Sequence, residues 1–115
     1  MSRSVRTYLL HIHDETEFLI NSLTGFNKAG FLADETRKRA FVRSLEVIGE
    51  AVKRLPMEFR DQYPQTPWRA SAGMRDRLIH GYDSIDYEIV WEAVTVAIPQ
   101  LAETINLMLN RDDIN

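Results

Sequence analysis

Apolar residues recur at steps of three and four along most of this 115-residue chain, a spacing that places them on one face of an α-helix. The pattern predicts long helices over residues 4–23, 34–55, 66–80 and 84–109, and no stretch alternates convincingly as a strand would. It is clearest in the second helix, at Phe41, Leu45, Ile48, Val52 and Leu55. Four helices with short connections predict an all-α fold, an antiparallel up-and-down bundle of four to five helices, with residues 1–115 as one domain.

Capping residues and prolines mark the expected helix ends. Asp34 is a suitable N-cap for the second helix, and Pro56 stops that helix. Thr66-Pro67 is a start signal for the third helix, which should end near residue 80 because Gly81 is a natural residue just past a helix end. Pro99 interrupts the last helix, but the apolar pattern continues on both sides, so we expect one kinked helix.

Two shorter features add detail to this bundle. Residues 26–32 contain Phe26, Phe31 and Leu32 and suggest a short turn or helical shoulder that closes over the core. Gly49 stands inside the second helix, where glycine costs about 1 kcal/mol relative to alanine. A close helix crossing at Gly49 would explain that cost.

Composition excludes several classes of protein. The chain has no cysteine, so disulfides, thiolate metal sites and a cysteine nucleophile are excluded. No apolar run reaches the roughly 18–20 residues that span a bilayer, and the N-terminus lacks the features of a signal peptide, so we expect a cytoplasmic protein. The net charge of −3 argues against a broad basic surface for nucleic acid, though not against a small basic site. His11 and His13 are two residues apart and point to different helix faces, so we expect no metal site.

The segment Met74–Tyr82 concentrates the chemistry of the chain. It contains a permanent cation, a carboxylate, an imidazole and a phenol: Arg75, Asp76, His80 and Tyr82. On a regular helix Arg75 and His80 would lie about 140° apart and could not face one phosphate. Either the helix ends and releases His80 from helical geometry, or two chains share the site.

Cleavage of RNA without a metal needs a base, an acid and positive charge on the phosphate. One chain offers one histidine in this segment, whereas a two-fold dimer would offer two histidines and two arginines. Plainer interpretations are a salt bridge from Arg75 to Glu50 and a packing role for Tyr82. Arg69 and Arg77 flank the motif and are candidates for phosphate contact, while Trp68 and Trp91 are expected to be core or interface anchors.

The spacing Arg75-(four residues)-His80-Gly81-Tyr82 resembles the signature of the HEPN superfamily, and more narrowly the HepT-type toxins of HEPN/MNT toxin–antitoxin modules. The resemblance extends over nearly the whole chain. It includes residues 43–56 in the second helix, the approach to the motif at 67–75, and Ile85-Asp86, Trp91 and 99–101 in the last helix.

This resemblance implies a homodimeric, metal-independent endoribonuclease that uses no cofactor. Arg75 and His80 would be catalytic, with Asp76 in support, where relatives often have asparagine. The implied partner is a minimal nucleotidyltransferase antitoxin (MntA-like) that AMPylates Tyr82 and so blocks RNA by bulk and charge. The alternative is a non-catalytic HEPN binding module that partners or regulates a nucleotidyltransferase.

Overall fold

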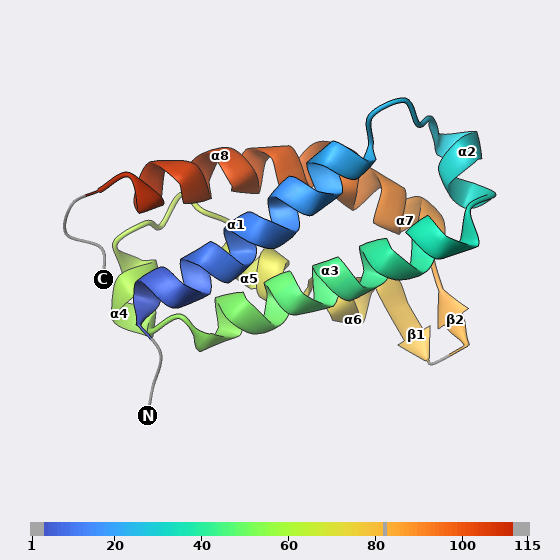
Figure 1. The fold of residues 1–115 in the computed structure, drawn as a ribbon. Helices are drawn as coiled ribbons and strands as arrows, with labels where there is room; N and C mark the ends of the chain where they lie inside the picture. Colours follow the sequence, from blue (N-terminus) through green and yellow to red (C-terminus); the bar gives the residue numbers. More distant parts are fainter. Residues whose placement is uncertain (1–3, 82, 112–115) are drawn as a thin grey trace.

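The computed structural model describes residues 4–81 and 83–111, and gives the backbone alone for His80 and Gly81. Three long helical segments form the frame: α1 (Val5–Ser22), α3 (Glu35–Arg54) and α8 (Ile98–Leu109). Helix α1 packs against both α3 and α8 and runs antiparallel to each of them (Figure 1). The prediction of an all-α antiparallel bundle is therefore confirmed.

Shorter elements close the two ends of this frame. Helix α2 (Lys28–Leu32) joins α1 to α3 at one end, and α4 (Met57–Asp61) follows α3 at the other (Figure 1). Helices α5 (Trp68–Ala72) and α6 (Met74–Leu78) then return along α3 and lead into the strands β1 (Ile79–Gly81) and β2 (Ser84–Ile85). Among the described residues, no helix combines the length and the apolar character that a membrane span requires.

Side-chain caps, of which Asp34 was predicted and Ser4 was not, explain where the first two long helices begin. The Ser4 hydroxyl accepts a hydrogen bond from the Thr7 N–H at 3.2 Å, and Asp34 Oδ1 accepts one from the Arg37 N–H at 3.0 Å. The hydrogen bond from the Arg37 N–H, followed by that from its guanidinium, holds the pKa of Asp34 below its ordinary value. At its other end α3 gives way to extended backbone at Leu55, directly before Pro56.

The prediction of one helix over residues 66–80 is wrong. Gly73 ends α5 and starts α6, with φ −89° and ψ 4°, and α6 itself ends at Leu78 because Ile79 is extended. Ile79 pairs with Ile85, and Gly81 with Ser84, in an antiparallel hairpin that the sequence pattern did not predict. Gly81 thus lies in a strand and does not cap a helix.

The last helix is continuous through Pro99, as predicted. Helix α7 (Tyr87–Glu92) passes through a π-helical segment, η1 (Ala93–Ala97), into α8 (Figure 1). In the wider π turn the Ile98 N–H donates to the Ala93 carbonyl, five residues back. This local widening lets the helix accommodate Pro99, whose backbone nitrogen carries no hydrogen to donate.

The apolar face of α3 forms the centre of the core. Its five predicted positions, from Phe41 to Leu55, are all at most 1% exposed. On another side of α3, Gly49 is buried against α5, where an added Cβ would lie 3.4 Å from the backbone oxygens of both Ser71 and Ala72. The close helix crossing expected at Gly49 is therefore confirmed.

This crossing predicts how side-chain size at position 49 affects stability. We expect Gly49→Leu to lower the free energy of unfolding by about 1–3 kcal/mol, because a bulky side chain must force α5 away from α3. Gly49→Ala, the control, should stay within about 1 kcal/mol of wild type because its gain in helix propensity offsets mild crowding. Thermal and denaturant unfolding measure both variants, and equal stability of the leucine variant would contradict the crossing.

Candidate active site

Helix α6 presents the charged residues of the motif to solvent. Met74 and Leu78, four residues apart, are 4% and 1% exposed and anchor one side of this short helix in the core. The three residues between Met74 and Ile79 that carry charge, Arg75, Asp76 and Arg77, are consequently exposed. Burial of the apolar residues at both ends of α6 therefore leaves two arginines and one aspartate exposed to solvent.

Arg75 is held by carboxylates on two sides. Its Nε lies 3.5 Å from Oε2 of Glu46 on α3, and its Nη1 lies 3.8 Å from Oδ1 of Asp76. About half of the Arg75 side chain, 52%, stays exposed, so the guanidinium is oriented and still open to an anionic ligand. This arrangement suits a cation that must meet a phosphate at a fixed place.

The prediction that Arg75 pairs with Glu50 is wrong, because the carboxylate that meets Arg75 lies one helical turn earlier on α3. Glu46 makes the ion pair, whereas Glu50 lies 3.8 Å from Lys53 and lines a hollow beside Tyr8 and His11 of α1. Glu46 is three residues before Gly49, on the side of α3 that α5 and α6 approach. The spacing to Gly49 is the signal that could have identified it from the sequence.

His80 follows the end of α6 by two residues and belongs to β1. The Asp86 N–H donates to the Leu78 carbonyl at 3.0 Å and ties the start of α7 to the end of α6 across the hairpin. Of the two alternatives for the motif, the end of the helix is observed in the backbone, at Leu78 and not at residue 80 as predicted. The side chain of His80 and the whole of Tyr82 lie outside the described residues.

The two flanking arginines lie on neighbouring short helices. Arg69 is on α5 and Arg77 on α6, and both are exposed. Arg69 shares a surface pocket with Asp76 and with Lys53 of α3, a cation that the motif alone did not indicate. Trp68 is 8% exposed, with its indole N–H donating to the carbonyls of Arg60 and Tyr63, which confirms its predicted place in the core.

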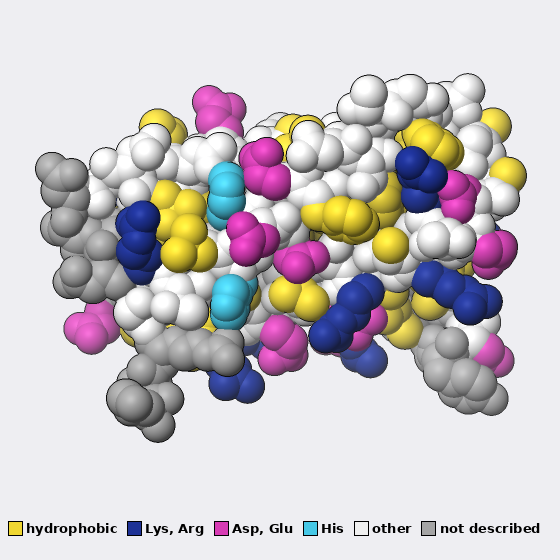
Figure 2. Space-filling model, viewed as in Figure 1, with side chains coloured by type: hydrophobic (Ala, Val, Ile, Leu, Met, Phe, Trp, Pro, Cys, Tyr) yellow, Lys and Arg dark blue, Asp and Glu magenta, His cyan; other side chains and the backbone are white. Residues whose placement is uncertain are grey.

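The histidines of α1 have other neighbours. His13 Nδ1 lies 3.0 Å from Asn106 Oδ1 of α8, and the His11 ring meets Tyr8 edge-on. In the part of the chain that is described, no three histidine, aspartate or glutamate residues gather where they could hold a metal ion. Figure 2 shows the face that α1 and α3 form: acidic side chains gather over its middle, and most lysines and arginines lie along its lower edge. A nucleic acid would be repelled from the middle of this face.

Comparison with known proteins adds independent evidence. The sequence model of the family described as "Ribonuclease HepT-like" matches residues 12–108. "Putative RNase TTE0752" of Caldanaerobacter subterraneus subsp. tengcongensis is 46% identical over 96% of this chain and 98% of its own length. "Putative RNase MJ0127" of Methanocaldococcus jannaschii is 43% identical over 84% of this chain and 80% of its own. "Probable ribonuclease HepT" of Thermococcus cleftensis is 39% identical over 88% and 92%.

With this extent of similarity, the chain belongs to the Ribonuclease HepT-like family, within the HEPN superfamily. The resemblance found in the sequence is thereby confirmed. No solved structure matches the chain closely enough to support a comparison of coordinates.

Proposed function

We propose that this protein is a metal-independent endoribonuclease and the toxin of a toxin–antitoxin pair. The observation that carries the proposal is the half-exposed Arg75, oriented by Glu46, on a helix that ends two residues before His80. Membership of the Ribonuclease HepT-like family and the relatives named as RNases support the same activity.

The reaction needs no external reagent. A base removes the proton of a ribose 2′-hydroxyl, whose oxygen attacks the adjacent phosphorus. The bond to the 5′-oxygen breaks, and an acid protonates that oxygen. The products are a 2′,3′-cyclic phosphate and a free 5′-hydroxyl. His80 is the proposed proton carrier, since imidazole gives and takes protons near neutral pH.

Arg75 would stabilise the negative charge that grows on the phosphate oxygens in the transition state. Asp76, 3.8 Å from the guanidinium, would help to orient it. Arg69 and Arg77, both exposed on helices next to the motif, would contact neighbouring phosphates. A homodimer that brings two motifs together would supply one histidine as base and the other as acid.

The partner proposed with this activity is a minimal nucleotidyltransferase antitoxin. It would transfer AMP from ATP to the hydroxyl of Tyr82, releasing pyrophosphate. Bulky anionic groups two residues from His80 would exclude RNA by occupancy and by charge.

Replacement of the histidine tests the catalytic assignment. Expression of the wild-type chain alone should arrest growth, and His80→Ala should relieve the arrest. In vitro, purified His80→Ala should cleave total RNA at least about a hundredfold more slowly, because acid–base transfer contributes typically 10²–10⁴-fold. Undiminished cleavage by this variant would rule out the mechanism, and a wild-type protein that binds the nucleotidyltransferase without cleaving RNA would favour the binding module.

Glu46 and Glu50 provide a matched pair of variants one turn apart on α3. Glu46→Gln should slow RNA cleavage several-fold because Arg75 loses the carboxylate that orients it, while the free energy of unfolding changes by less than about 1 kcal/mol. Glu50→Gln removes the same charge from the same helix but keeps the Glu46–Arg75 pair, and should slow cleavage much less than Glu46→Gln. Equal effects of the two variants would mean that the Glu46–Arg75 pair does not position the arginine.

Tyr82 is the proposed site of modification. Incubation with the partner enzyme and ATP should add the mass of one or more AMP units to the wild-type protein and none to Tyr82→Phe. Intact-mass spectrometry measures the difference, and RNA cleavage by the modified protein should fall in parallel. Equal modification of both proteins would refute the assignment.

A further inference from the structure

A pocket of about 470 Å³ opens beside the motif, between the end of α3 and the helices α4, α5 and α6. Ligand pockets in proteins fall in this range of volumes. One part of its wall is apolar and consists of Met57, Pro64, Trp68 and Ala72. Met57 is 64% exposed, so this apolar wall is open to solvent at its mouth.

Cations outnumber carboxylates in the pocket by three to two, on a protein whose overall charge is negative. The cations are Lys53, Arg60 and Arg69, and the carboxylates are Asp61 and Asp76. Arg60 Nε is buried and has no hydrogen-bond acceptor among the described residues. Because protein atoms cover this Nε, the cations that a ligand in the open pocket would meet are Lys53 and Arg69.

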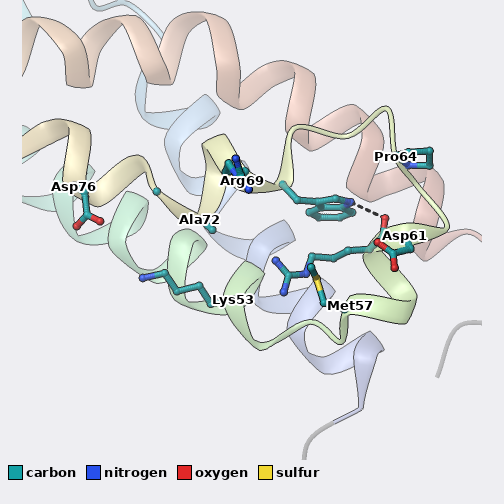
Figure 3. A pocket seen from close by; sticks show the side chains of 10 residues that line it. Lys53, Met57, Asp61, Pro64, Arg69, Ala72 and Asp76 are labelled. Carbon is teal, nitrogen blue, oxygen red and sulfur yellow. Dashed lines mark hydrogen bonds between the residues drawn. The ribbon is translucent and has the colours of Figure 1, made fainter.

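The pocket has two chemically different ends. Figure 3 shows Lys53 and Asp76 at one end, Asp61 and Pro64 at the other, and Met57 between them. Asp76 is also the neighbour of Arg75 on α6, so the end with Lys53 is continuous with the candidate active site. The end next to the motif therefore carries one cation and one carboxylate, and Met57 of the apolar wall lies farther from the motif.

We propose that this pocket binds one nucleotide of the RNA strand on one side of the phosphate that is cleaved. The base packs against Met57 and the apolar wall, and the phosphate of that nucleotide meets Lys53 and Arg69. Single-stranded RNA combines flat bases with an anionic backbone, and proteins that bind it combine apolar or aromatic platforms with cations. The inference rests on the proposed RNase function for the identity of the strand.

A pair of exposed apolar residues, each replaced by glutamate, tests the pocket with the same change of net charge in both variants. Met57 and Leu107 are 64% and 66% exposed, and Leu107 lies on α8, outside the pocket. The probe is a short fluorescent 2′-O-methyl RNA, which cannot be cleaved because its 2′-oxygen is blocked. Its affinity is measured by anisotropy at one fixed salt concentration.

Met57→Glu should weaken binding of this RNA about tenfold or more, since a carboxylate replaces the surface that meets the base. Leu107→Glu should change the affinity less than about twofold, and Met57→Leu should stay close to wild type. Thermal unfolding of each variant checks that the fold is kept. Equal losses from the two glutamate variants, or no binding of RNA by the wild type, would overturn the proposal.

Two further arms separate the remaining outcomes. Adenosine 5′-monophosphate should bind far more weakly than the oligonucleotide; equal affinity would make this a site for a free nucleotide and overturn the inference. If the wild type cleaves unmodified RNA and Met57→Glu binds RNA normally, the pocket proposal is refuted and the proposed RNase function is kept. If the wild type binds RNA through Met57 but does not cleave it, the RNase function is refuted and the pocket proposal is kept.

Discussion

The close approach of α5 to α3 at Gly49 is the constraint on which the candidate site depends. Glu46, Gly49 and Lys53 follow one another at steps of three and four and therefore share one side of α3. Because position 49 lacks a side chain, α5 and the α6 that follows it lie close to this side. Glu46 then reaches Arg75, and Lys53 enters the wall of the pocket. A single helix side thus contributes to both the proposed catalytic group and the proposed nucleotide site.

Stability and function draw on different interactions in this molecule. The core of fully buried side chains from α1, α3, α7 and α8 supplies the hydrophobic stabilisation. The ion pairs of Arg75 are partly exposed, and pairs of this kind contribute only about 0–1 kcal/mol to stability. Their effect is to orient a guanidinium that remains open to solvent. Variants at Glu46 are therefore expected to change activity far more than stability.

The sequence predicted the long helices and the short helix α2 well, and the elements between residues 57 and 85 poorly, for a physical reason. Helices α1 and α3 carry repeated apolar positions and side-chain caps, so local signals and tertiary packing agree. Residues 66–85 are divided by Gly73 and closed by the pairing of Ile79 with Ile85, an interaction across the chain that no helical periodicity reveals. The motif also predicted Glu50 as the partner of Arg75 where the structure has Glu46, for a separate reason. The rotation of α3 relative to α6 follows from the crossing at Gly49, and not from the motif.

The most direct test of the proposed chemistry is the structure of the RNA ends that the purified wild-type protein produces in the presence of a metal chelator. Acid–base transfer through the ribose 2′-hydroxyl predicts continued cleavage, with a 2′,3′-cyclic phosphate on one fragment and a 5′-hydroxyl on the other. A 3′-hydroxyl with a 5′-phosphate, or the loss of cleavage when the metal is chelated, would contradict a site built on Arg75 and His80 alone.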